Sequence, residues 1–224
     1  MPTVSEAIRS SRWAHSLTPE ELARVEATVI ERTVPVDGYV CRTGQPVDAW
    51  IGVIEGLVKL CPASQAGKSA AFTCVTAGGW FGEGSVLKDR VWRFDAVALR
   101  RSRIAYVPRE TFEWLLDDNI GFNRFLLHQL NERLGLFIGM IETDRLLDPD
   151  TRVARCLAGL FNEYLYPGIH QRLQLSQEEI GHLCGLSRQR ANQALQVLAK
   201  AGILEAEYGH ITVLDLDALR SFGR

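Results

Sequence analysis

The stretch Leu175–Leu204, LSQEEIGHLCGLSRQRANQALQVLAKAGIL, has the pattern of two helices joined by a tight turn. Ser176 and Glu179 form a capping box, which is typical of a helix start. Gly185 follows the apolar end of that helix, at a position that favours the left-handed conformation. Ser187 is the expected N-cap of the next helix. The stretch therefore predicts a helix-turn-helix.

The second of these helices has one apolar and one polar face. Its apolar side chains are Ala191, Ala194, Leu195 and Leu198. Its opposite face carries Arg188, Gln189, Asn192, Gln193 and Gln196. Arginine pairs with guanine through two hydrogen bonds, and asparagine or glutamine pairs with adenine in the same way. Residues 187–200 include three basic residues and no acidic one, although the net charge of the chain is −2, so we interpret this face as a DNA-reading surface rather than an ordinary solvated one.

The predicted DNA contacts divide into two kinds. Base readout is assigned to Arg188, Gln189, Asn192 and Gln193. Contacts that position the helix on phosphate are assigned to Ser187, Arg190 and Lys200. Ser176 and Gln196 complete the predicted DNA-binding set. Residues 203–207 and 211–214 predict a β-hairpin that would form a wing beside the helix-turn-helix.

A long amphipathic helix is expected before this region, from about Arg109. Its apolar residues Leu126, Leu130, Leu134, Phe137 and Ile141 are separated by steps of 4, 4, 3 and 4, which is a heptad pattern. We predict that these residues form a dimer seam; an ordinary helix that packs on the rest of the chain is the alternative. The break at Asp148-Pro149 is the predicted boundary. Together with Pro108, which ends the preceding region, it divides the chain into residues 1–108, 109–147 and 148–224.

The first of these regions has the sequence pattern of an all-β domain. Between about Val34 and Val107, short apolar runs alternate with Gly, Pro and Asp, and nine of the nineteen glycines lie between Gly38 and Gly84. Runs of this length with turn residues between them are typical of a β-sandwich or barrel. Before it, Thr18-Pro19 predicts the start of a helix.

Taken in order, these features resemble the Crp–Fnr family of bacterial transcription regulators over nearly the full length. The matching residues are Gly44 and Gly56 in the β region, Phe81-Gly82-Glu83, Arg133-Leu134 on the long helix, and Ser187-Arg188. The resemblance implies an α+β fold with an N-terminal cyclic-nucleotide-binding-like β-roll (a double-stranded β-helix or jelly roll), a dimerisation helix and a C-terminal winged helix-turn-helix. It also implies a homodimer that reads a palindromic operator in double-stranded DNA, with RNA polymerase as a further expected partner.

The resemblance also implies an effector pocket. Its candidate residues are Gly82, Glu83, Gly84 and Ser85, here called the cassette, together with Arg93, Phe137 and Ile138. In cyclic-AMP-responsive members an Arg-Ser pair follows the cassette, and here Arg93 could take the phosphate only with a one-residue shift. Phe137 and Ile138 fall where the family has a Thr-Ser pair, and neither can hydrogen-bond a base. Cyclic AMP is therefore disfavoured, and a more apolar effector or no effector stays open.

Composition excludes several other classes of protein. With 224 residues, 46% of them hydrophobic and 23% charged, the chain is long and apolar enough for two ordinary domains and is not intrinsically disordered. Lys and Arg total 25 and Asp and Glu total 27, so any DNA-binding surface must be local. No apolar run reaches the roughly 20 residues of a membrane span, and the N-terminus lacks the apolar core of a signal peptide. We therefore expect a soluble cytoplasmic protein that does not bind membranes.

Metal and cofactor chemistry is not expected. No cysteine precedes Cys41, and the next two follow after gaps of 20 and 13 residues, which argues against an iron–sulfur cluster. No histidine lies between Pro35 and Pro108, so neither a haem ligand nor the His-rich metal site of a barrel enzyme is predicted there. The chain is expected not to be an enzyme. The alternative to a transcription regulator is a ligand-binding sensor whose DNA binding is weak or vestigial.

Overall fold

The computed structural model describes residues 2–62, 73–88, 90–146, 148–169, 172–207 and 209–223, without the side chains of residues 140–146. The described residues form two compact units. Unit 1 contains the chain up to residue 132 and also residues 164–168. Unit 2 contains residues 133–163 and 169–224. Each unit is described by itself below.

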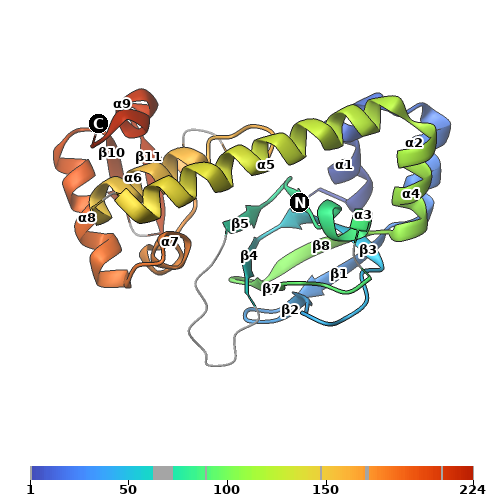
Figure 1. Cartoon of the computed structure of the whole chain (residues 1–224), viewed down its shortest axis with the longest axis horizontal. Helices are drawn as coiled ribbons and strands as arrows, with labels where there is room; N and C mark the ends of the chain where they lie inside the picture. The colour runs from blue at the N-terminus through green and yellow to red at the C-terminus, as the bar shows by residue number, and fades with distance from the viewer. Residues whose placement is uncertain are drawn as a thin grey trace. The chain divides into compact units, whose positions relative to one another are not determined.

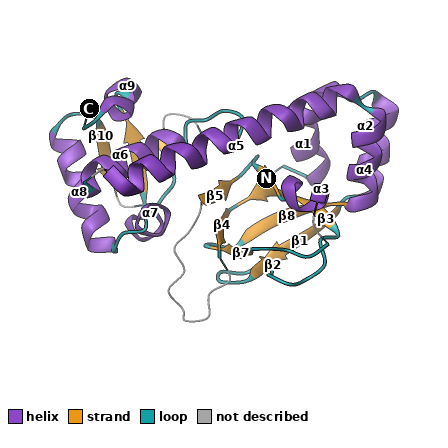
Figure 2. Cartoon of the chain, in the orientation of Figure 1, coloured by secondary structure: helices purple, strands orange, loops and turns teal. Residues whose placement is uncertain are grey.

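Unit 1 is built around two four-stranded antiparallel sheets (Figure 2). Its strands are β1 (Ile30–Val34), β2 (Tyr39–Cys41), β3 (Ala49–Glu55), β4 (Leu57–Cys61), β5 (Thr73–Thr76), β6 (Trp80–Phe81), β7 (Asp95–Ala98) and β8 (Ser102–Pro108). The strand orders are β1-β8-β3-β6 and β2-β7-β4-β5. This arrangement confirms the predicted β-roll. The strands are mostly buried because apolar residues of both sheets line one core.

Four helical segments pack against the roll. They are α1 (Val4–Arg9), η1 (Arg12–Ser16), α2 (Pro19–Thr28) and α4 (Arg109–Asp118). The predicted helix start at Thr18 is confirmed, since its side chain accepts a hydrogen bond from the backbone of Glu21. Figure 1 shows α2 beside α4, and the guanidinium of Arg24 lies 3.8 Å from the ring centroid of Trp114 between them.

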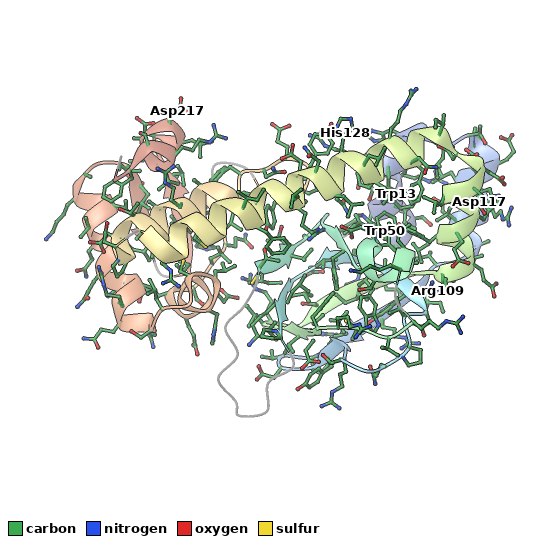
Figure 3. The ribbon with its side chains drawn as sticks, in the orientation of Figure 1. Trp13, Trp50, Arg109, Asp117, His128 and Asp217 are labelled. Atoms are coloured by element: carbon green, nitrogen blue, oxygen red, sulfur yellow. The ribbon has the colours of Figure 1, made fainter. Side chains whose placement is uncertain are left out.

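An aromatic cluster joins these helices to the sheet. Its members are Trp13, Trp50, Trp80, Phe112 and Phe122, and their contacting ring centroids lie 4.4 to 6.0 Å apart. Figure 3 shows Trp13 and Trp50 next to each other, in agreement with their centroid distance of 5.3 Å. Because large rings bury much apolar surface and prefer edge-to-face contacts, this cluster is the main apolar anchor of unit 1.

The predicted long helix from Arg109 is in fact two helices. α4 ends at Asp118, and α5 (Ile120–Leu146) follows after Asn119, whose backbone is extended with φ −119° and ψ 105°. The Asn119 side chain accepts a hydrogen bond from the Phe122 backbone at 2.8 Å and donates to the carbonyl of Ser16 at 3.2 Å. Asn119 therefore begins a new helix rather than continuing the first, because asparagine caps helix starts well.

The predicted dimer seam is only partly exposed. Leu126 is wrong as a seam residue, because it is 3% exposed and belongs to the apolar core of unit 1. Leu130 and Phe137 are half-buried, Leu134 is 58% exposed, and the side chain of Ile141 lies outside the described residues. Among the residues of α5 whose side chains are described, the large exposed apolar ones are instead Ile120, Leu127, Leu134 and Ile138. Their steps of 7, 7 and 4 also place side chains on one face of a helix.

Unit 2 is mainly helical with a small sheet. Its elements after α5 are α6 (Pro149–Gly159), β9 (Arg172–Leu173), α7 (Gln177–Cys184), α8 (Arg188–Lys200), β10 (Leu204–Glu207), β11 (His210–Val213) and α9 (Leu216–Ser221). The predicted hairpin is confirmed as β10 and β11, and β9 adds a third strand in the order β10-β11-β9. The short helix α9 follows the hairpin and packs against α6, with the side chain of Leu219 fully buried.

Candidate functional site

The first helix of the predicted helix-turn-helix, α7, has the expected ends. The Ser176 side chain accepts a hydrogen bond from the Glu179 backbone at 3.2 Å, and the Glu179 carboxylate accepts one from the Ser176 backbone at 2.7 Å. At the other end Gly185 has φ 62° and ψ 35°, a left-handed conformation that glycine adopts without the strain of a Cβ atom. The capping box and the terminal glycine are both confirmed.

The turn after α7 is tight because Gly181 lies against its backbone. A Cβ atom at Gly181 would be 2.8 Å from the carbonyl oxygen of Leu186, too close for any other residue without a shift. The Leu186 amide in turn donates to the Gly181 carbonyl at 2.8 Å. The Ser187 side chain then accepts from the Arg190 backbone at 3.2 Å and begins α8. Helix α8 therefore starts at a position that α7 determines.

Helix α8 separates its apolar and polar residues as the sequence predicts. Four side chains are buried in unit 2, each no more than 1% exposed: Ala191, Ala194, Leu195 and Leu198. Five of the predicted DNA contacts are exposed: Arg188, Gln189, Gln193, Gln196 and Lys200. The exposed face combines two cationic side chains with three neutral amides. Such a face can approach polyanionic DNA and still offer donors and acceptors to base edges.

Two other predicted DNA contacts are held by unit 2 itself. Nη2 of Arg190 lies 2.6 Å from Oδ1 of Asp150 in the first turn of α6. Asn192 accepts a hydrogen bond from the side chain of Gln177 on α7 at 2.9 Å. Both side chains are half-buried. The sequence did not reveal these two partners. Their contacts hold α8 against α6 and α7.

The wing carries negative charge in contrast to α8. Glu205 and Glu207 of β10 are exposed, and Arg172 of β9 lies 3.5 Å from Glu207 in an ion pair. An anionic wing is repelled by phosphate unless its charges are paired. Positive charge for DNA therefore comes from α8 rather than from β10.

The cassette in unit 1 is covered by an aromatic side chain. Gly82 has φ 94°, and a Cβ atom there would be 2.7 Å from the ring of Trp92. Glu83 and Ser85 are both buried residues of the short helix α3 (Glu83–Lys88). The structure thus brings together the glycine, the glutamate and the serine of the cassette, with an indole against the glycine.

The remaining candidates for the effector pocket are not gathered at the cassette within unit 1. Arg93 is exposed on the bend before β7, whereas its neighbour Trp92 is buried. Phe137 and Ile138 belong to the part of α5 that lies in unit 2, where the first is half-buried and the second exposed. The assignment of Arg93, Phe137 and Ile138 to an effector pocket therefore stays a prediction.

A cavity of about 350 Å³ lies in unit 1 among residues that the sequence analysis did not consider. Its lining is contributed by Ile30, Arg32, Val40, Cys41, Gln45, Pro46, Asp48, Ala49, Ile51, Trp92, Tyr106 and Pro108. Trp92 is shared between this cavity and the cassette. No motif could have revealed the cavity, because its walls come from strands far apart in the sequence.

Burial raises the pKa of two groups in this cavity. The Tyr106 hydroxyl donates to the carbonyl of Val40 at 3.2 Å, and burial raises the pKa of Tyr106 to about 12. Burial likewise raises the pKa of the Cys41 thiol well above its usual range. Cys41 is therefore an inert apolar lining residue rather than a reactive thiol.

Other site types were sought in the part of the chain that the structure describes. No group of three or more His, Cys, Asp or Glu side chains there could hold a metal ion. All five cysteines are free thiols. No helix among the described residues is both long and apolar enough to cross a membrane.

Two family models match the chain. A cyclic nucleotide-binding domain matches residues 31–119, which include the roll and the cassette. A Crp-like helix-turn-helix domain matches residues 151–222, which include α7, α8 and the wing. The two models thus cover the two features built above from the residues.

Curated relatives and solved structures agree in architecture. The chain is 26% identical over 200 residues to a "CRP-like cAMP-activated global transcriptional regulator" of Mycobacterium tuberculosis, covering 86% of this chain and 89% of the relative. It is 27% identical over 184 residues to "Transcriptional regulator SdrP" of Thermus thermophilus, covering 78% and 84%. The structure of FixK2 from Bradyrhizobium japonicum matches with a TM-score of 0.73 at 19% identity, covering 88% of this chain and 98% of that one. This last likeness supports the fold alone.

Proposed function

Because the chain belongs to the Crp–Fnr family of DNA-binding transcription regulators, we propose that it acts as a homodimer on a palindromic operator in double-stranded DNA. The observation that carries this proposal is the exposed face of α8, which has cations and amides but no carboxylate. Each protomer would place one α8 helix in the major groove. The two half-sites would then lie about one helical turn apart.

The surroundings of each side chain suggest its role on DNA. Arg188, Gln189, Gln193 and Gln196 are exposed and would read base edges. Ser176, Ser187 and Lys200 would contact phosphate. Arg190 and Asn192, which the structure ties to α6 and α7, would instead act as positioning residues that hold α8 in place.

The exposed apolar face of α5 supports the homodimer. Leu127 is 67% exposed, Leu134 58% and Ile138 51%, and large apolar side chains at such spacing are typical of a helix that packs against a partner. A second copy of α5 presents the same face, so a two-fold dimer would bury both. The proposal replaces Leu126 with Leu127 in the seam and retains Leu134.

The cyclic nucleotide-binding domain points to a small-molecule effector, and we propose that this effector is not cyclic AMP. The indole of Trp92 lies against Gly82, and Arg93 is exposed rather than buried beside the cassette. Phe137 and Ile138 offer no hydrogen bond to a base. An apolar or aromatic ligand suits these residues better than a cyclic nucleotide.

The proposed function sets two further expectations. A regulator that reads chromosomal operators must work in the bacterial cytoplasm, which is where we place it. RNA polymerase is the expected partner once the operator is bound. The competing function, a sensor with vestigial DNA binding, is favoured by no observation on α8.

The direct test uses Arg188. Bound fragments are first selected from random duplex DNA at one stated salt concentration, since affinity depends steeply on salt. Arg188→Ala should then weaken binding to the selected operator by about 1–3 kcal/mol, roughly 5- to 150-fold, and relax one base position. The reason is that Arg188→Ala removes a bidentate contact to one base of the operator. Random DNA does not carry that base at the matching position, so its binding should change less.

Lys200→Ala is the matched control, because a phosphate contact is lost equally on operator and random DNA. Equal losses on both DNAs for Arg188→Ala would contradict base readout by this residue. No enrichment of any sequence by the unmodified protein would point to an effector missing from the selection or to the vestigial sensor, and would move the search to small molecules.

A further inference from the structure

We propose that residues 164–168, Tyr-Leu-Tyr-Pro-Gly, form a strap that docks on unit 1 and couples it to the DNA-binding unit. The inference rests on the proposed function, because it concerns the regulation of the same DNA-reading surface. The path of the chain between the two units suggests such a strap. The chain passes from unit 1 into unit 2 within α5, returns to unit 1 for residues 164–168, and then enters unit 2 again. Unit 2 is therefore joined covalently to unit 1 both through α5 and through the strap.

The centre of the strap is buried in unit 1. Leu165 and Tyr166 are 5% and 4% exposed. The Tyr166 hydroxyl lies 2.8 Å from the hydroxyl of Thr73, itself 5% exposed, at the start of β5. A hydrogen bond between two buried hydroxyls favours the docked strap, because breaking it inside the unit costs hydrogen-bond energy that water does not replace there.

Tyr164, the first residue of the strap, contacts side chains of two other elements, α5 and η1. The Tyr164 ring stacks on His128 of α5 with centroids 5.7 Å apart and an interplanar angle of 29°. The guanidinium of Arg12 in η1 lies 4.6 Å from the same ring centroid. Figure 3 marks His128 on the part of α5 that belongs to unit 1. The strap therefore contacts η1, α5 and β5 within one unit.

Glycines on both sides bring the strap close to the turn between β5 and β6. A Cβ atom at Gly79 would be 3.0 Å from the carbonyl oxygen of Leu165, and one at Gly168 would be 2.5 Å from that of Ala77. A Cβ atom at Gly78 would lie 3.2 Å from the ring of Pro167. Only residues without side chains allow this close backbone approach. We call the turn between β5 and β6, which includes Gly78 and Gly79, the seat of the strap.

The same turn leads directly into the cassette. Gly79 is followed by β6 and then by Gly82, so the seat of the strap and the cassette share one short segment. Trp80 of β6 is held in the aromatic cluster and donates to the Ser11 hydroxyl at 3.0 Å. A ligand that moves the cassette would also move the seat. The strap then has two states, docked and released, whose balance the ligand can shift.

The docked strap should favour binding to two half-sites at once. It restricts the orientations of unit 2, so less conformational freedom is lost when both recognition helices of a dimer engage DNA. Release should weaken binding to a palindrome. It should not change binding to a single half-site, because the α8 face itself is untouched.

The test is Tyr166→Phe in the full chain without added ligand. Hydrogen exchange of peptides that cover residues 160–169 reports docking without DNA. Fluorescence anisotropy reports affinity for the selected palindrome and for the same duplex with one half-site scrambled. We expect faster exchange of the strap and roughly tenfold weaker binding to the palindrome, with half-site binding unchanged. Thr73→Val should give the same result.

Tyr39→Phe is the control, since it removes a phenol hydroxyl from an exposed side chain of unit 1 that lies outside the cavity and the strap contacts. It should change neither strap exchange nor DNA binding. Unchanged exchange in both Tyr166→Phe and Thr73→Val would overturn the docking of the strap. Faster exchange with an unchanged palindrome affinity would overturn the coupling. Failure of the unmodified protein to bind the palindrome would contradict the proposed function instead, and the exchange data would still report docking.

Discussion

Arg188 and Arg190 have the same side chain, but the structure gives them different surroundings. Arg188 at the first position of α8 is exposed. Arg190 is turned to Asp150, with a nitrogen–oxygen distance of 2.6 Å. An ion pair that is partly buried contributes more to stability than an exposed one, because water screens it less. The first residue is therefore available to DNA, and the second connects α8 to α6.

A stability measurement should separate these two roles. Arg190→Ala and Asp150→Ala should each lower the free energy of unfolding by about 1 kcal/mol, and the double variant should lose less than the sum. Arg188→Ala should change it by no more than about 0.5 kcal/mol, because its side chain is at the surface. Denaturant titration of all four variants measures these values. A larger loss for Arg188→Ala than for Arg190→Ala would show that the assignment is reversed.

At the scale of elements, the break between α4 and α5 decides which face of α5 is free. Asn119 starts α5 afresh, and Phe122 and Leu126 then point into unit 1. The opposite face exposes Leu127 and Leu134. A heptad pattern alone cannot tell a core face from a dimer face, because both require the same apolar spacing. The exposed fractions make that distinction.

The dimer proposal gives a test at this scale. Leu134→Glu should shift the protein from dimer to monomer, because a buried carboxylate in an apolar interface lacks a partner. Analytical ultracentrifugation measures the shift, which should be at least tenfold in the dissociation constant. Val36→Glu introduces the same charge at an exposed apolar residue of the β-roll, outside α5, and should leave the dimer intact. A Leu134→Glu protein that stays dimeric would place the interface on another surface.

The whole molecule combines a DNA-reading unit with a domain that is similar to cyclic nucleotide-binding domains. Its net charge of −2 is not that of a general DNA binder, which is why we propose that recognition depends on the local face of α8. Control by a ligand requires two states with different affinities for that ligand. The cassette, the cavity beside Trp92 and the strap are the parts of unit 1 where such states can differ.

The effector proposal is tested on the whole protein. Selection from random duplex DNA, with and without added cyclic AMP, should recover the same palindrome with similar enrichment in both arms. The reason is the Trp92 ring against Gly82 and the lack of a polar side chain at Phe137 and Ile138. A palindrome recovered only in the presence of cyclic AMP would contradict the proposal.

Local rules explain why much of this architecture could be predicted. The capping box at Ser176, the left-handed Gly185 and the cap at Ser187 depend on residues within one helical turn. The buried and exposed faces of α8 follow from a periodicity of 3.6 residues. The β-roll followed from short apolar runs and turn glycines. Local sequence therefore determined the elements and the polar face of α8.

Contacts between distant residues were decided only by the tertiary structure. The partner of Arg190, the burial of Leu126 and the cavity at Trp92 each depend on how separate elements pack. The strap is the clearest case, since the Tyr166 and Thr73 hydroxyls meet across 93 residues of chain. Periodicity and capping carry no information about such pairs, because these patterns describe a segment's own hydrogen bonds and faces. Packing then decides which face finds a partner and which one stays free for DNA.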